Sequence, residues 1–150
     1  MGLEQLDAFL RRHRCVAIDA SPFIYQLQDN PRYLPATNKI FTWLERAGSS
    51  GVTSCLTLTE LLVQPMKEGD EDRVEEFFGL LTRYPHLEWV PVSVPIAARA
   101  ARLRVMHRLR TPDAILAATA VYSKATGLIS NDTLFRRLDE IQVMLLDDVV

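Results

Sequence analysis

Cysteine is scarce in this sequence, with two residues among 150, and both lie inside apolar runs. Two cysteines cannot supply a disulfide framework, so we expect Cys15 and Cys55 to be buried free thiols in a reducing compartment. Glycine is also scarce, with six residues, and there is no Gly-rich phosphate loop, internal repeat or low-complexity tract. No apolar run reaches the ~20 residues of a membrane helix, and the N-terminal stretch lacks the apolar segment of a signal peptide. These absences predict a cytoplasmic protein with no membrane partner.

The sequence also lacks a large excess of charge of either sign, because it has 17 Lys and Arg residues and 19 Asp and Glu residues, for a net charge of −2. A protein that is basic throughout is therefore excluded, and any affinity for nucleic acid would need a local basic patch or a metal ion. Hydrophobic residues make up 48% and charged residues 24%, the balance of a globular protein. We expect a single domain over residues 1–150, with residues 1–14 forming an additional N-terminal helix.

Short β-rich runs alternate with longer amphipathic runs along the chain. Strands are expected over residues 15–19, 52–56, 87–92, 127–130 and 142–146. Helices are expected over residues 21–27, 36–47, 70–83, 95–109 and 111–126, with a further helix that begins at residue 57. This alternation predicts an α/β fold, a three-layer α/β/α sandwich with a central, mostly parallel, five-stranded sheet. Such sheets bind ligands beyond the carboxyl ends of their strands.

Four carboxylates are predicted at that edge of the sheet. Asp19 ends the first strand, and Asp132 lies just beyond the fourth. Glu60 and Asp113 are each expected in the first turn of a helix. Each acid alone has a structural explanation, as a turn residue or a helix cap, and Glu60 has the spacing of a capping box with Thr57. Together, however, four converging carboxylates would repel one another unless a cation neutralised them, and oxygen ligands without His or Cys suit Mg²⁺ or Mn²⁺.

A basic stretch leads directly into the Asp113 motif. Between Ile96 and Pro112 there is no acidic residue. The same stretch contains five arginines, which are Arg99, Arg102, Arg104, Arg108 and Arg110. These side chains could bind backbone phosphates and direct a nucleic-acid strand toward the metal. The alternative is an exposed helix face whose apolar side is formed by Ile96, Ala100, Leu103 and Met106.

The sequence resembles the PIN domain family, and more narrowly the VapC-type toxins of toxin–antitoxin pairs. The resemblance extends from about Cys15 to the C-terminus, and Pro-Asp-Ala at residues 112–114 is its most specific part. About fourteen residues precede the first strand, whereas many members of the family begin almost at that strand. The segments that match the four family motifs are Val16-Ala-Ile-Asp19-Ala-Ser21, Thr57-Leu-Thr-Glu60-Leu, Thr111-Pro-Asp113-Ala-Ile-Leu-Ala-Ala-Thr-Ala120 and Leu128-Ile-Ser-Asn-Asp132-Thr-Leu-Phe135.

The resemblance implies a metal-dependent endoribonuclease that cleaves RNA through a metal-activated water and leaves a 5′-phosphate and a 3′-hydroxyl. Asp19 and Asp113 would be the principal ligands of Mg²⁺ or Mn²⁺, and Asp132 the next. Glu60 would bind the metal through water or orient the attacking water. The positions that would support the acids or contact the scissile phosphate are Ser21, Ser130 and Asn131.

The resemblance also implies two protein partners. A cognate antitoxin would insert a helix or an arginine near the acidic pocket, and a second copy of the chain would complete a homodimer. Two alternatives remain open at this point, a PIN-fold module that binds RNA or protein without cutting and a stand-alone nuclease of RNA processing. Because all four acids are present, the sequence favours an enzyme over a binding module.

Overall fold

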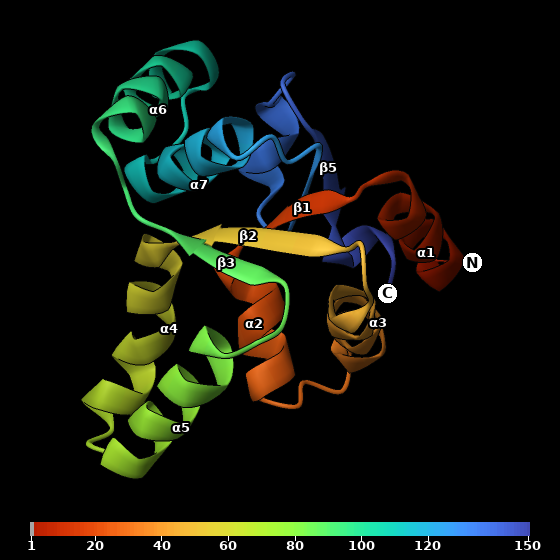
Figure 1. Cartoon of the computed structure of the whole chain (residues 1–150), viewed down its shortest axis with the longest axis vertical. Coiled ribbons are helices and arrows are strands. Elements are labelled where there is room, and N and C mark those ends of the chain that lie inside the picture. The colour runs from red at the N-terminus through yellow and green to blue at the C-terminus, as the bar shows by residue number, and fades with distance from the viewer. Residues whose placement is uncertain (1) are drawn as a thin grey trace.

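A single sheet of parallel strands forms the centre of the molecule (Figure 1). The computed structural model describes residues 2–150. The strands are β1 (Cys15–Ile18), β2 (Ser50–Ser54), β3 (Leu87–Val90), β4 (Gly127–Ser130) and β5 (Gln142–Leu145). They lie in the order β3-β2-β1-β4-β5, and all four pairings between neighbours are parallel. The predicted five-stranded sheet is therefore confirmed.

Helices cover both faces of this sheet (Figure 1). They are α1 (Gly2–Arg12), α2 (Ala20–Leu27), α3 (Leu34–Glu45), α4 (Cys55–Lys67), α5 (Glu71–Thr82), α6 (Val94–His107) and α7 (Thr111–Tyr122), with short 3₁₀ helices η1 (Thr133–Arg137) and η2 (Leu146–Asp148). Helices α6 and α7 pack together on one face, and α1 to α5 lie on the other. This arrangement confirms the α/β/α sandwich. No helix within residues 2–150 is long and apolar enough to cross a membrane.

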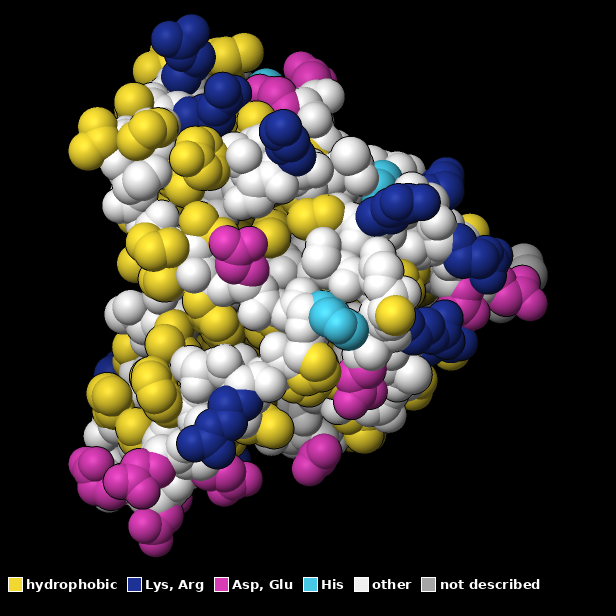
Figure 2. Space-filling view, in the orientation of Figure 1, with side chains coloured by type: hydrophobic (Ala, Val, Ile, Leu, Met, Phe, Trp, Pro, Cys, Tyr) yellow, Lys and Arg dark blue, Asp and Glu magenta, His cyan; other side chains and the backbone are white. Residues whose placement is uncertain are grey.

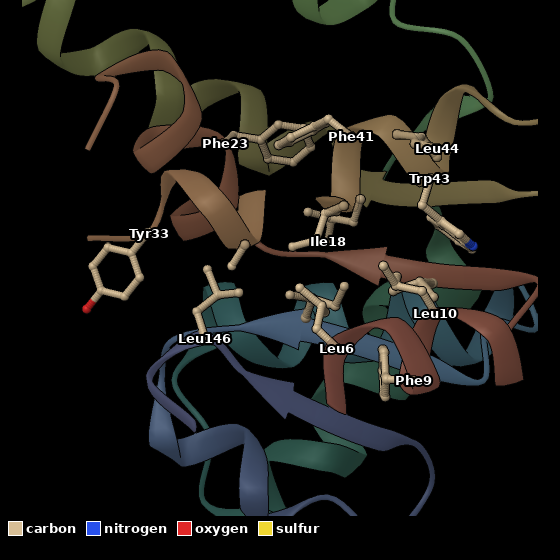
Figure 3. Close-up of a cluster of buried hydrophobic side chains, with 14 of the residues drawn as sticks. Leu6, Phe9, Leu10, Ile18, Phe23, Tyr33, Phe41, Trp43, Leu44 and Leu146 are labelled. Carbon is tan, nitrogen blue, oxygen red and sulfur yellow. The ribbon is translucent and has the colours of Figure 1, made fainter. Parts of the chain in front are cut away.

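The hydrophobic core has two parts because successive side chains of a strand point to opposite faces. Ala17 of β1 packs in the cluster under α6 and α7, whereas Ile18 packs in the cluster under the other helices. Leu6, Phe9 and Leu10 recur at helical spacing and turn one side of α1 into the second cluster. Figure 3 shows these three side chains gathered with Ile18. Helix α1 is thus part of the core.

Four helices, α2, α3, α4 and α6, begin one or two residues earlier than the sequence predicts, and the shifts of α2 and α4 affect candidate site residues. Helix α2 begins at Ala20, one residue before its expected start, and Asp19 lies at its N-cap position. Strand β2 ends at Ser54 and not at residue 56, and the Ser54 hydroxyl accepts a hydrogen bond from the Leu56 amide as the N-cap of α4. The predicted capping box between Thr57 and Glu60 is therefore wrong. The prediction fails because the Ser54 hydroxyl, three residues before Thr57, caps the helix, and Glu60 then lies in the second helical turn.

The same shift changes the environment of Cys55. The cysteine is the first residue of α4 and is exposed, and so the prediction of a buried thiol is wrong at this position. Cys15 is partly buried in β1. Both thiols are free, as predicted.

Candidate active site

The strand order creates a crevice at one edge of the sheet. From the central β1 the chain proceeds to β2 and β3 on one side and then returns to place β4 on the other side. Ligands bind at such a reversal point, beyond the carboxyl ends of the strands. Asp19 follows β1 and Asp132 lies two residues beyond β4. The parallel register, in which Ile18 pairs with Ile129, brings the ends of these two strands side by side.

Ser130, the last residue of β4, connects these two acids. Its hydroxyl donates a 2.6 Å hydrogen bond to Asp19 Oδ2 and accepts a 3.0 Å bond from the Asp132 backbone amide. The Ser130 side chain is fully buried, so water does not compete for these bonds. Ser130 therefore fixes the Asp19 carboxylate relative to the chain that carries Asp132.

Arg110 connects Asp132 to the third acid, Asp113. Arg110 Nε donates to Asp113 Oδ2 over 2.9 Å, and an Nη atom of the same guanidinium donates to Asp132 Oδ2 over 2.7 Å. Arg110 also occupies the N-cap position of α7, which begins at Thr111 as the sequence predicts. A continuous chain of contacts thus links Asp113, Arg110, Asp132, Ser130 and Asp19.

Glu60 approaches the cluster from α4 and interacts with it through charge. Burial and the neighbouring Asp19 and Asp113 carboxylates raise the pKa of Glu60 above its ordinary value, while Arg110 lowers it. Glu60 thus faces the charges of Asp19 and Asp113 from the exposed surface of α4. All four predicted carboxylates therefore belong to one electrostatic cluster.

Burial is the largest influence on the pKa values of Asp19 and Asp113. Burial raises the pKa of Asp19, the Ser130 hydrogen bond lowers it, and Asp113 and Asp132 raise it further. Burial also raises the pKa of Asp113, and its bond to Arg110 acts in the opposite direction. Such groups favour a nearby positive charge. The donor set, carboxylate oxygens without sulfur or imidazole, fits Mg²⁺ or Mn²⁺.

The present arrangement of these acids is open. Across the part of the chain that the structure describes, no three Asp, Glu, His or Cys side chains are gathered closely enough to hold one ion together. A cation that used several of these carboxylates would therefore have to draw them closer. Among the described residues, Arg110 is the one basic side chain that forms ion pairs with two of them.

Ser21 and Asn131 support the end of β4. The Ser21 hydroxyl accepts a 3.0 Å bond from the Asn131 amide. The Asn131 side chain donates to the hydroxyls of Tyr25 and Tyr33, and its oxygen accepts a bond from the Asp147 amide. These bonds favour a supporting role for Asn131 over a phosphate contact. Sequence reasoning missed Tyr25, Tyr33 and Asp147, since no motif marks them.

The arginines of the basic stretch have different surroundings. Arg104 folds back and donates to the Leu109 carbonyl and the Thr111 hydroxyl, which stabilises the turn between α6 and α7. Arg99 and Arg102 are exposed on α6. Figure 2 shows basic and hydrophobic side chains together over the α6 end of the molecule. Met106 is 61% exposed there, so its predicted place on the buried side of the helix is wrong.

Replacing Asp19 by asparagine should stabilise the protein in the absence of metal. The raised pKa means that folding favours the protonated carboxyl, so the ionised group destabilises the native state once the pH exceeds its unfolded pKa. Asparagine can still accept the Ser130 hydrogen bond and carries no charge. We expect a gain of about 1 kcal/mol, or roughly 3 °C in Tm, at pH 7. Thermal unfolding in a chelating buffer measures it.

The pH dependence supplies the control for this prediction. Below the ordinary pKa of an aspartate the carboxyl is protonated in both the folded and the unfolded state, so the difference between the variant and the wild type should vanish there. A difference in Tm that stays constant from pH 7 to pH 3, or an Asp19→Asn variant less stable than the wild type at pH 7, would contradict the role of burial at Asp19.

Comparison with known proteins gives one family and one fold. The model of the PIN domain family matches residues 16–141. No curated protein is similar enough in sequence to count as a match.

Several solved structures share the fold. A chain of VapBC2 from Rickettsia felis, in a complex with promoter DNA, is 15% identical with a TM-score of 0.68, over 87% of this chain and 98% of that chain. A chain of a toxin–antitoxin complex from Klebsiella pneumoniae is 23% identical, with a TM-score of 0.64, over 87% and 97%. VapC20 from Mycobacterium tuberculosis, described as a toxin that cleaves the sarcin–ricin loop, is 14% identical, with a TM-score of 0.58, over 75% and 86%. At these identities the likeness establishes the fold.

Proposed function

The chain belongs to the PIN domain family, and we propose that it is a metal-dependent endoribonuclease that acts as the toxin of a toxin–antitoxin pair. One observation supports this proposal most directly. Four carboxylates from separate parts of the chain form one electrostatic cluster at the edge of the sheet where ligands bind, and Ser130 and Arg110 link three of them. A purely structural role would not require four acids to face one crevice, where burial and neighbouring carboxylates oppose their ionisation.

The proposed mechanism assigns a role to each acid. Asp19 and Asp113 would hold the cation, with Asp132 as a further ligand. Mg²⁺ or Mn²⁺ supplies a more acidic water and a positive charge that offsets the negative charge of the phosphodiester. Ser130 keeps Asp19 oriented through its hydrogen bond. Glu60, whose raised pKa makes it a better proton acceptor, would take a proton from the attacking water on a carboxylate oxygen.

The proposed partners are RNA, an antitoxin and a second copy of the chain. Arg99, Arg102 and Arg108 are exposed and could bind backbone phosphates of the RNA. A pocket of about 120 Å³, lined by both apolar and polar side chains, includes Glu60 and would accept one side chain of an antitoxin helix that lies across it. Its apolar lining includes Ile24, Leu27, Leu61 and Phe77. The solved complexes of toxins with antitoxins that share this fold support such a partner.

The test is cleavage of a mixed RNA pool by the purified protein, free of antitoxin, with Mg²⁺ or Mn²⁺. We expect discrete cuts that carry 5′-phosphates and that disappear when a chelator is in excess, because the carboxylates alone provide no cation. Ligation-based mapping of the ends identifies both the chemistry and the target. Cutting that persists in the chelator would contradict the proposal. No cutting by the folded, cation-loaded protein would favour an RNA- or protein-binding module.

A stand-alone nuclease of RNA processing would produce the same cuts. It differs from a toxin in having no antitoxin, so inhibition of cleavage by a co-expressed cognate partner separates these two roles.

A further inference from the structure

The positively charged guanidinium of Arg110 offsets the negative charges of two acids of the cluster, Asp113 and Asp132. It contacts one oxygen of Asp113 and one oxygen of Asp132, at 2.9 and 2.7 Å. The other oxygen of Asp132 already accepts the Leu134 amide, over 2.9 Å, as the N-cap of η1. Both oxygens of Asp132 are therefore engaged. A divalent cation that binds Asp132 or Asp113 has to approach the guanidinium charge closely, because Arg110 already lies within hydrogen-bond distance of both carboxylates.

The backbone of Arg110 lies in a stabilised turn, whereas its side chain lies at the surface and is held there by its two carboxylate partners. Arg104 of α6 donates hydrogen bonds to the Leu109 carbonyl and to the Thr111 hydroxyl, across the turn between α6 and α7. Within this turn, Arg108 adopts a left-handed conformation with φ 55°. The Arg110 side chain is 68% exposed and borders solvent rather than a packed core. It can therefore leave the carboxylates without unfolding the turn that carries it.

We propose that Arg110 is an internal counter-ion that competes with the divalent cation for Asp113 and Asp132, and that binds an RNA phosphate once the cation displaces it. This inference rests on the cation site of the proposed function. A guanidinium and a divalent cation compete for the same two carboxylates, because their positive charges repel at such short range and one guanidinium already offsets part of the negative charge that the cation would bind. The displaced guanidinium remains tethered beside the acids, and its planar fork of donors matches the oxygens of a phosphate.

The proposal predicts opposite effects on two ligands of the same site. Removal of the guanidinium should strengthen cation binding, since a competitor is lost, and weaken RNA binding, since a phosphate contact is lost. A residue that merely orients the acids would give the opposite sign for the cation. Cation affinity measured without RNA therefore distinguishes competition from orientation.

The experiment is calorimetric titration of the full chain with Mn²⁺ in the absence of RNA. We expect Arg110→Gln to bind Mn²⁺ about tenfold more tightly than the wild type and to cleave RNA with a raised KM. Arg110→Lys, which keeps the charge but loses the fork, should have an intermediate affinity. The control is Arg136→Gln, which removes the arginine of an exposed pair with Asp148 and should leave the Mn²⁺ affinity within twofold. Far-UV circular dichroism verifies the fold of each variant.

Each outcome decides the matter. Equal or weaker Mn²⁺ binding by Arg110→Gln, with wild-type binding intact, overturns the competition and leaves the proposed nuclease standing. An absence of Mn²⁺ binding in every variant overturns both the cation site and this inference. Tighter binding in Arg110→Gln and in the Arg136→Gln control alike would show a general effect of charge and would also overturn the specific role of Arg110.

Discussion

Asp113→Asn should lower the rate of RNA cleavage by about 10³-fold or more while the protein remains folded. The side chain is buried in the first turn of α7, and asparagine has nearly the same shape. The substitution removes one negative oxygen from the proposed cation site. A loss of this size corresponds to roughly 4 kcal/mol of transition-state stabilisation, which is within the range supplied by a bound metal ion. Single-turnover cleavage of a mapped RNA substrate measures the effect.

A matched substitution controls for the loss of a paired carboxylate. Asp148 is exposed and pairs with Arg136 outside the acidic cluster, so Asp148→Asn should change the rate by less than about twofold. Asp113→Asn should also keep a cooperative thermal unfolding transition. Cleavage by Asp113→Asn at more than a tenth of the wild-type rate would remove Asp113 from the proposed catalytic set.

Phe9→Ala should cost about 3–5 kcal/mol of the free energy of unfolding. Phe9 is fully buried, its ring lies 4.4 Å from the ring of His13, and it contacts β4 so closely that a methyl group on Gly127 would lie 2.7 Å from Phe9 Cζ. The backbone of a central strand cannot move to fill the space that alanine would leave. A domain of this size has a total stability of roughly 5–15 kcal/mol, so the variant should be only marginally stable.

The chain offers another phenylalanine as the control for this prediction. Phe78 of α5 is 50% exposed, and Phe78→Ala should change the free energy of unfolding by less than about 0.5 kcal/mol. Urea denaturation of both variants and the wild type provides the comparison. Similar small losses at the two positions would show that α1 is not an integral part of the core.

The sequence predicted the sheet and the acids for one physical reason. The carboxyl ends of parallel strands lie at the same edge of the sheet, so residues that follow different strands can be placed near one another without coordinates. Asp19 after β1 and Asp132 after β4 follow this rule. The first residues of the helices were predicted less accurately. Ser54 and Thr57, for example, both carry hydroxyls that could cap α4. The structure resolves the ambiguity through Thr53, whose hydroxyl donates to Thr57 and engages it elsewhere.

The supporting contacts of the site lay beyond sequence reasoning. Ser130 and Asp19 are 111 positions apart, and Asn131 meets Tyr33 across 98 positions. Charge indicated that Arg110 could bind a backbone phosphate, but five arginines shared that property within one stretch. Only the turn between α6 and α7 decides which of them reaches Asp113 and Asp132. Long-range pairing of this kind has no local pattern.

The position of β4 beside β1 has a consequence for synthesis of the protein. A ribosome makes β1 and Asp19 long before it makes β4, yet β1 needs β4 as its neighbour and Asp19 needs Ser130 as its hydrogen-bond partner. Helix α1 is made earlier still and packs Phe9 against Gly127 at the start of β4. The acidic cluster therefore assembles late, after residue 132 has left the exit tunnel, and a nascent chain short of that point carries no complete acidic cluster.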